Sequence, residues 1–189
     1  MIQIRTSTEW RTAYPGAIIG LLELTGLDNT RISAELNQHK RETEKRMRRD
    51  YAGFSRKDFL KLPVMAAYDT YYKHFGKTFH VQLQVESIVL KGKNLPMISP
   101  LVDASFTAEV DTFLLTASHD AESLFEPVGI DISYPGDTIT LSNGEIKPIR
   151  PGDMVMRDGY GVCCSILYGH DNRSLVSPST RHALYVTYA

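Results

Sequence analysis

The last third of the chain is divided into short segments by pairs of turn-forming residues, and this feature most limits the folds open to it. The pairs are Pro135-Gly136, Asn143-Gly144, Pro151-Gly152 and Asp158-Gly159. Glycine supplies the positive φ angles of tight turns, so such pairs are typical of β-hairpins. We expect β segments at residues 130–133, 138–141, 154–157, 161–167 and 183–188. Together they predict a mainly antiparallel sheet.

The strongest helical signal comes before this region, at Ser99-Pro100, where Ser99 is expected to be the N-cap of a helix. Proline at the first position of a helix sacrifices no hydrogen bond, because that N–H has no partner inside the helix. Apolar side chains then recur on one helical face, which predicts a helix from residue 100 to about 116. His119 and Asp120 should follow the end of this helix.

The earlier part of the chain is also mainly helical in its spacing. Asp28-Asn29-Thr30 offers N-cap side chains for a helix to about residue 50. Further helices are expected over residues 56–75, with an interruption at Pro63, and over 81–90, where alternation also suits a strand. Two strands, at 2–5 and 17–25, should come first, the second buried on both faces. Helices before strands predict an α+β fold, and the 189 residues suit a single domain.

The charge of the chain limits its partners. There are 21 basic and 22 acidic residues, for a formal net charge of −1. Six of the basic residues lie in the run 40–49, which also holds two acidic ones. This run is either a phosphate-binding patch or a solvated helix with its own ion pairs, Glu42 with Arg46 and Glu44 with Arg48. Any contact with RNA should be local, and we expect no binding to DNA.

The cysteines and the apolar segments indicate the cellular compartment of the chain, and the spacing of histidines and cysteines indicates whether it binds a metal. Cys163 and Cys164 are adjacent, which disfavours a disulfide between them and suggests a reducing, cytoplasmic compartment. The chain start lacks a signal-peptide pattern, and residues 17–24 are too few to cross a membrane. No His-x-x-x-His or Cys-x-x-Cys spacing occurs, so we expect no metal and no other cofactor. In a β segment, one cysteine should face the core and the other a cleft.

Several segments in register resemble the B3/B4 domain, the tRNA-editing module of the bacterial phenylalanyl-tRNA synthetase β subunit, and free-standing versions of it most of all. They are residues 94–103, the helix after them, and the closing runs 149–158 and 180–189. The resemblance covers roughly residues 17–189. It implies a B3/B4-like fold, with helices packed on a mainly antiparallel sheet. It also implies a cleft between the proline-started helix and the sheet, where a mischarged amino acid is removed from tRNA by hydrolysis.

The resemblance also implies roles for residues near the proline-started helix. Asp103 matches the acidic residue of the Pro-Leu-Val-Asp signature, and Ser105 falls where a small hydroxyl residue is frequent. Phe106 replaces an asparagine that is credited with substrate contact. Asp120 matches the family aspartate, while the family histidine falls on an alanine and His119 appears two residues later.

The amino acid rejected by the family is not expected here. The glutamate that reads the tyrosine hydroxyl in the editing domain has no counterpart, because Glu145 is the last glutamate of the chain. A site that selects a hydroxyl depends on such a buried partner. The scaffold therefore carries over better than the substrate.

Two groups of residues have functional and plain interpretations. At the C-terminus of a helix, the dipole favours the charged form of His119, which could orient water or bind phosphate. Alternatively, His119 only caps the helix and Asp120 begins a turn. The segment from Tyr168 to Arg173 suits a terminal adenosine, with stacking on Tyr168, His170 nearby and phosphate on Arg173. It equally suits a simple hairpin turn.

The functional hypothesis is a trans-acting hydrolase of mischarged aminoacyl-tRNA. Asp103, His119 and Asp120 are the catalytic candidates, and the substrate-binding candidates are Ser105, Phe106, Tyr168, His170 and Arg173. The expected partner is the aminoacylated 3′ end of tRNA, with no membrane. Alternatives are a non-catalytic module that binds tRNA, a free amino acid or a nucleoside, and an interaction protein with a degenerate cleft. The sequence makes no prediction of oligomeric state.

Overall fold

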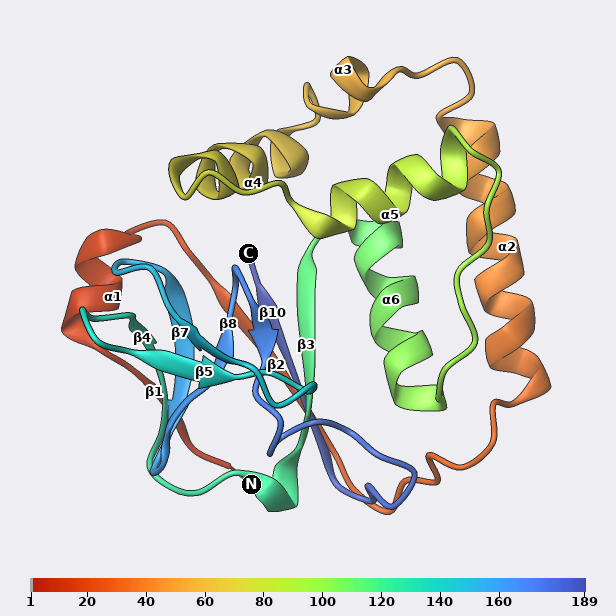
Figure 1. Ribbon diagram of the computed structural model, residues 1–189. Coiled ribbons are helices and arrows are strands. Elements are labelled where there is room, and N and C mark those ends of the chain that lie inside the picture. Colours follow the sequence, from red (N-terminus) through yellow and green to blue (C-terminus); the bar gives the residue numbers. More distant parts are fainter. Residues whose placement is uncertain (1) are drawn as a thin grey trace. The chain divides into compact units, whose positions relative to one another are not determined.

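The structure is a computed structural model that describes residues 2–189. The chain forms two compact units, drawn in Figure 1. The sheet unit consists of the chain up to Asp28 together with Ala117–Ala189, and the helical unit consists of Asn29–Thr116. The helical unit is thus an insertion in the sequence of the sheet unit. That all 189 residues behave as a single domain stays a prediction.

The sheet unit contains a five-stranded sheet in the order β1-β4-β7-β8-β9, a three-stranded sheet in the order β2-β10-β3, and the hairpin β5-β6. Its elements are β1 (Ile4–Thr6), α1 (Thr8–Ala13), β2 (Ile19–Leu24), β3 (Leu115–Asp120), the 3₁₀ turn η1 (Ala121–Ser123), β4 (Val128–Ile132), β5 (Thr138–Thr140), β6 (Ile146–Pro148), β7 (Met154–Asp158), β8 (Gly161–Ser165), β9 (Gly169–His170) and β10 (Ala183–Tyr188). β1 pairs with β4 in parallel, whereas β4, β7, β8 and β9 pair antiparallel in succession. The predicted α+β fold with a mainly antiparallel sheet is confirmed.

The turn-forming pairs have the geometry that their glycines predict, with one variation. Gly136, Gly144 and Gly152 have positive φ angles of 96°, 82° and 87°. At the fourth pair the positive φ belongs to Gly161, not Gly159. Gly159 is required for a different reason, because a Cβ there would lie 2.9 Å from the carbonyl oxygen of Glu126. A side chain at this position would displace the backbone.

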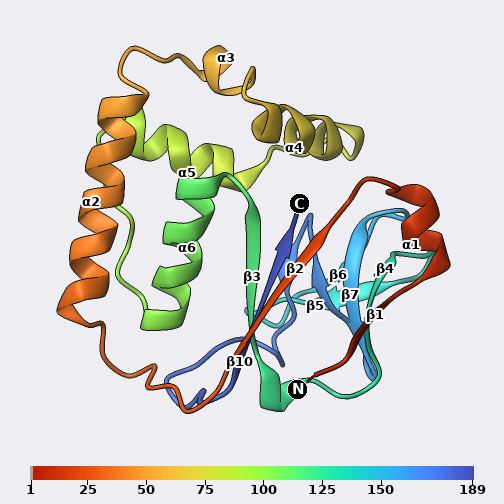
Figure 2. The same ribbon diagram turned by 180° about the vertical axis from the view of Figure 1, so that it is seen from behind.

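Strand β2 is present where a strand was predicted, but the prediction that it is buried on both faces is wrong. β2 is the edge of its sheet and pairs antiparallel with β10 alone, as the view from behind shows (Figure 2). Leu21 and Leu22, which as neighbours in a strand point to opposite faces, are both exposed. An apolar run of this length predicts a strand without indicating how many neighbours cover it. The sequence also did not predict helix α1 or strands β3, β6 and β9.

The helical unit contains five helices among the residues described. They are α2 (Ala34–Asp50), α3 (Arg56–Phe59), α4 (Pro63–His74), α5 (His80–Val89) and α6 (Pro100–Thr112). Four predictions are confirmed here, namely α2, the break at Pro63, the helical state of α5, and α6 with proline at its first turn. Helices α2, α5 and α6 pack against one another (Figure 1). Between residues 2 and 189, no helix is long and apolar enough to cross a bilayer.

The residues that cap the N-termini of α2 and α6 differ from those predicted. Helix α2 starts at Ser33, whose Oγ accepts from the Leu36 N–H at 3.0 Å, and not at residues 28–30. Asn29 instead accepts a hydrogen bond from the Leu101 N–H at 2.9 Å, in the first turn of α6. Ser99, the N-cap of α6, makes no capping hydrogen bond with its side chain. A residue distant in sequence therefore caps the helix that Ser99 was expected to cap.

Helix α6 ends at Thr112, four residues before the predicted end, because Phe113 adopts a left-handed conformation with φ of 62°. This conformation is unfavourable for a bulky residue. The Phe113 ring is nevertheless buried and lies 5.7 Å from the ring of Tyr51, and this packing offsets the conformational cost. The chain then enters strand β3, which carries His119 and Asp120. The prediction that these two residues follow a helix end is therefore wrong.

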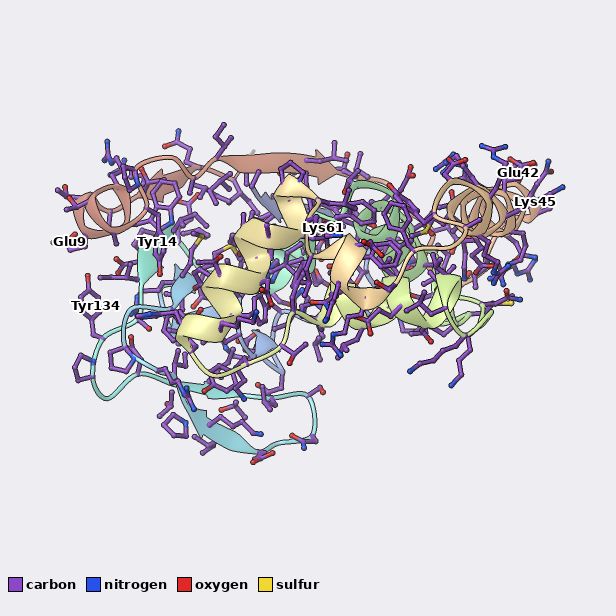
Figure 3. The ribbon with its side chains drawn as sticks, turned by 90° about the horizontal axis from the view of Figure 1, so that it is seen from above. Glu9, Tyr14, Glu42, Lys45, Lys61 and Tyr134 are labelled. Atoms are coloured by element: carbon purple, nitrogen blue, oxygen red, sulfur yellow. The ribbon has the colours of Figure 1, made fainter. Side chains whose placement is uncertain are left out.

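The basic side chains of α2 mostly make contacts within the helical unit. Arg46 pairs with Asp111, and Arg48 donates to the carbonyl of Lys93 at 2.8 Å and lies 4.0 Å from Glu44. Glu42 and Lys45 point outward from the helix (Figure 3). The predicted pair Glu44–Arg48 is present, whereas Arg46 pairs with Asp111 and not with Glu42. The ion-paired helix is the interpretation that these contacts favour, rather than a phosphate-binding patch.

Candidate functional site

Asp103 is fully buried, and both of its carboxylate oxygens are engaged inside the helical unit. Oδ2 forms an ion pair with the ammonium group of Lys40, which is itself fully buried. Oδ1 accepts from the Ile98 N–H at 2.9 Å, and the Lys40 ammonium also donates to the Pro96 carbonyl at 2.5 Å. Asp103 thus joins α2, α6 and the segment before α6. The catalytic role that the resemblance implies for Asp103 stays a prediction, and these contacts are structural.

Three other residues singled out by the resemblance are Ser105, Phe106 and Asp120. The buried Ser105 donates its hydroxyl to the Leu101 carbonyl of its own helix at 3.2 Å, and Phe106 is half-buried. Asp120 ends β3, caps η1 and accepts the hydroxyl of Thr180 at 2.6 Å. These are local structural contacts. Functional roles for the three residues stay predictions.

His119 is the next-to-last residue of β3 and has no exposed surface. Its Nδ1 is 2.9 Å from the Ser174 hydroxyl, which in turn donates to Asp171 Oδ1 at 2.6 Å. Burial, and secondarily the neighbouring His170, lower the pKa of His119 well below its ordinary value. The expectation of a charged imidazole at a helix end is therefore wrong, because the residue is in a strand and away from water.

The His119 ring lies beside His170, with ring centroids 4.8 Å apart. Cys164 joins this pair, and the potential ligand atoms of the three residues all lie within 4.8 Å of one another. Both cysteines are buried, so the expectation that one of them lines a cleft is wrong. Burial raises the pKa of both thiols, that of Cys164 to about 12. The residues that could hold a metal ion are therefore His119, Cys164 and His170.

Arg173 and Tyr168 have different surroundings, Arg173 among carboxylates and Tyr168 against apolar side chains. The Arg173 guanidinium donates to both oxygens of Asp158, at 3.0 and 3.1 Å, and is 2.8 Å from Asp171. Tyr168 is partly buried and packs against the apolar cluster that includes Ile139. A stacking role for Tyr168 stays a prediction. The exposed ring near Arg173 is another tyrosine, Tyr160, over which the guanidinium lies at 5.3 Å from the centroid.

Arg173 lines a cavity of about 330 Å³ in the sheet unit. The lining is mostly polar and comprises Gly136, Asp137, Thr138, Thr140, Arg157, Tyr160, Gly161, Val162, Asp171, Asn172 and Arg173. Arg157 forms ion pairs with two carboxylates. Its Nε lies 3.1 Å from Asp131, and it pairs also with Asp137. Burial raises the pKa of Asp137, but the hydrogen bonds from Arg157 and from the Tyr134 N–H, together with the charge of Arg157, outweigh burial and lower the pKa overall. Asp137 therefore remains a carboxylate at neutral pH.

The sequence identified Arg173 and its segment, which also contributes Asp171 and Asn172, but not the lining residues outside that segment. Tyr160 follows the Asp158-Gly159 pair, so an exposed aromatic ring beside a predicted turn was a usable signal. Arg157 and Asp137 gave no such signal, because each is an ordinary charged residue until the strands bring them together. The same holds for the cluster of His119, Cys164 and His170.

Comparisons with known proteins give a distant structural similarity without support from sequence. No protein-family model matches the chain, and no curated protein matches it. Among solved structures, the chain is similar to an N-terminal fragment of the phenylalanyl-tRNA synthetase β subunit from Pyrococcus horikoshii, with a TM-score of 0.44 and 8% identity. The similarity covers 100% of this chain and 45% of that chain. The chain thus spans less than half the length of the fragment.

Proposed function

We propose that the protein binds the aminoacylated 3′ end of a tRNA in the cavity lined by Arg173 and hydrolyses the ester bond of a wrongly attached amino acid. The proposal joins the B3/B4 resemblance of the sequence to one structural observation, which is this polar cavity. Its volume of about 330 Å³ falls within the range of small-ligand sites. Terminal adenosine and its aminoacyl ester are ligands of suitable size and polarity.

The charges around the cavity favour the aminoacyl end over the phosphates of the RNA. Both guanidiniums are already paired, each with two aspartates: Arg157 with Asp131 and Asp137, and Arg173 with Asp158 and Asp171. Four carboxylates therefore face two guanidiniums. A phosphate would meet cations that are already neutralised, whereas the α-ammonium group and ribose hydroxyls of an aminoacyl ester would meet acceptors such as Asp137.

Hydrolysis at such a site needs little from the protein beyond positioning. The ester bond of aminoacyl-tRNA is reactive, so holding a water next to the carbonyl supplies much of the required acceleration. Asp137, which is ionised at neutral pH, is the carboxylate we assign to orienting the water or the α-ammonium group. Tyr160, 70% exposed, offers a face on which the terminal adenine can stack.

Binding without hydrolysis is the second candidate function. It is favoured by the lining of the cavity, which in the described part of the chain contains neither histidine nor cysteine. It is also favoured by His119, which is fully buried and cannot reach a ligand in the cavity without a structural change. The same cavity would then serve recognition of an acylated tRNA end or of a free aminoacyl compound.

A panel of tRNAs, each charged with a wrong amino acid, separates the two functions. We expect deacylation above the spontaneous rate for at least one member, measured by loss of radiolabelled amino acid. Asp137→Asn should reduce that rate by tenfold or more, because the amide no longer attracts an ammonium group or accepts a proton. Binding of a charged tRNA with no acceleration for any member would support the second candidate. Absence of both would contradict the proposal.

Replacement of Tyr160 tests whether the cavity is the binding site. Tyr160→Ala should weaken binding of charged tRNA by roughly tenfold or more, since stacking of a base on an aromatic ring contributes about 1–3 kcal/mol. Tyr134→Ala is the matched control, because Tyr134 is also exposed (Figure 3) and the Arg157 guanidinium lies 5.2 Å from the centroid of its ring. Tyr134 does not line the cavity. Filter binding at several salt concentrations gives both affinities. Equal losses in the two variants would exclude the cavity.

A further inference from the structure

The cluster of His119, Cys164 and His170 is assembled from three strands of the sheet unit. Cys164 in β8 and His170 in β9 are directly opposite each other in the antiparallel register. Opposite residues of an antiparallel pair point to the same face, with Cβ atoms about 5 Å apart. His119 comes from β3, which belongs to the other, three-stranded sheet. Regular strands thus fix all three side chains, which is the rigid support that a ligand site requires.

The hydrogen bonds around His119 determine which ring nitrogen carries the proton. The Ser174 hydroxyl has one proton and donates it to Asp171, so the Ser174 oxygen must accept from Nδ1–H of His119. Burial keeps the imidazole neutral, which leaves Nε2 with a lone pair. Nε2 is buried and has no hydrogen-bond partner among residues 2–189. A buried basic nitrogen of this kind is costly unless it binds something.

The chain Asp171–Ser174–His119 has the form of the outer support found at metal sites. A histidine ligand commonly donates its other N–H to a carboxylate or to a group held by one, which fixes the ring and increases its basicity. Asp171 is in turn fixed by accepting from the Ser174 N–H at 2.9 Å. The nitrogen that this support prepares is Nε2 of His119, the residue that forms the cluster with Cys164 and His170.

We propose that His119, Cys164 and His170 bind one zinc ion. Two imidazoles and a thiolate are ligands that zinc prefers, and three protein ligands leave a fourth position for water. In a tetrahedral site the ligand atoms are roughly 3.5 Å apart, so atoms that lie within 4.8 Å of one another must close by about 1 Å. His170 is only partly buried and provides the side from which an ion enters.

Binding changes the protonation and one hydrogen bond of the cluster. The Cys164 thiol loses its proton to solvent as the sulfur coordinates the ion, because a zinc ion stabilises the thiolate strongly. His170 Nε2 accepts from the Ser118 N–H at 3.0 Å, and coordination requires that this contact be given up or shared. The loss is one hydrogen bond, which is small beside the coordination of zinc by three ligands. The site goes beyond the proposed function and does not depend on it.

Cobalt titration of the full chain tests this site directly. After treatment with a chelator, addition of Co²⁺ should produce thiolate-to-cobalt charge-transfer absorption that saturates at one equivalent and is abolished by Zn²⁺. Cys164→Ser should remove the absorption, whereas Cys163→Ser should retain it. Cys163 is the matched control because it is the adjacent, equally buried cysteine and is not part of the cluster. Ser174→Ala should weaken zinc binding by roughly 10–100-fold, as loss of an outer support does at other sites.

Circular dichroism of each variant shows whether it is folded. If Cys164→Ser does not fold, His170→Ala, at a partly exposed position on the edge strand β9, takes its place with the same expected loss. The proposal is overturned if the unmodified protein shows no charge-transfer absorption. It is also overturned if the absorption survives Cys164→Ser or is lost with Cys163→Ser.

Discussion

Replacing Asp103 with alanine is expected to lower the free energy of unfolding by about 3–5 kcal/mol. The change leaves the ammonium group of Lys40 buried without its counter-charge, and both side chains of this pair are fully shielded from water. It also removes the acceptor of the Ile98 N–H. Guanidinium denaturation followed by circular dichroism measures the loss. A loss below 1 kcal/mol would contradict the structural role of Asp103.

A second ion pair between the same two helices provides the control. Arg46 of α2 pairs with Asp111 of α6, but both side chains are about 40% exposed. Water already solvates these charges, so Asp111→Ala should cost less than about 1 kcal/mol. The double variant Lys40→Met with Asp103→Leu should recover much of the stability lost in Asp103→Ala, because it leaves no unpaired charge.

The double variant also separates a structural role of Asp103 from the catalytic role implied by the B3/B4 resemblance. It has no carboxylate at position 103 and should remain folded. If deacylation of a mischarged tRNA persists in this variant, Asp103 acts through the fold alone. If the variant is stable, binds charged tRNA and has lost hydrolysis, the implied catalytic role is supported.

Replacing Glu109 with glutamine is expected to remove a large dependence of stability on pH. Glu109 is buried in α6, and burial raises its pKa to about 8 from the ordinary 4.5, against a hydrogen bond from the Thr116 N–H that lowers it. Its Oε2 has no hydrogen-bond partner among the described residues. The folded protein therefore holds this carboxyl group protonated at neutral pH.

The sign of the effect follows from the pKa of Glu109 being higher in the folded state, about 8, than in the unfolded state, 4.5. The folded state holds the proton more tightly than the unfolded state, so the stability conferred by neutral Glu109 is full below pH 4.5 and is lost as the pH rises to about 8. The gap corresponds to roughly 5 kcal/mol, at about 1.4 kcal/mol per pKa unit. Glu109→Gln should be close to neutral in effect at pH 5 and increasingly stabilising up to pH 9. Denaturation curves of both proteins across this range give the difference.

Glu44 is the control for this prediction. It is as buried as Glu109 but accepts from the Leu95 N–H at 2.6 Å and pairs with Arg41 at 2.9 Å. Glu44→Gln should destabilise the protein at every pH in the range, because it removes a paired charge and leaves Arg41 without its partner. A similar response of both variants to pH would contradict a raised pKa for Glu109.

Much of the secondary structure was predictable because its signals are local. Pro100 starts α6, Pro63 starts α4, and Gly136 and Gly144 adopt the positive φ angles that their turns need. In each case the conformational preference of one or two residues is enough. The sequence failed where a distant residue replaced a local signal, as when Asn29, and not Ser99, capped the first turn of α6.

The candidate sites were much less predictable than the elements that carry them. Arg173 was identified because several polar residues follow one another in a single segment. His119 was identified, but its environment was predicted wrongly, because Phe113 ended the helix early and placed His119 in a buried strand. No spacing in the sequence predicted that Cys164, directly opposite His170, would also lie next to His119.

By itself, the sequence determined the α+β class and the positions of most helices and turns. The tertiary structure alone decided that Lys40 is the partner of Asp103, that no cation among residues 2–189 pairs with Glu109, and that three ligand side chains from two sheets meet. The physical reason is the distance along the sequence over which each interaction acts. Backbone preferences act over a few residues, whereas burial and charge pairing depend on which segments, 50 or more residues apart, the fold brings within a few ångströms.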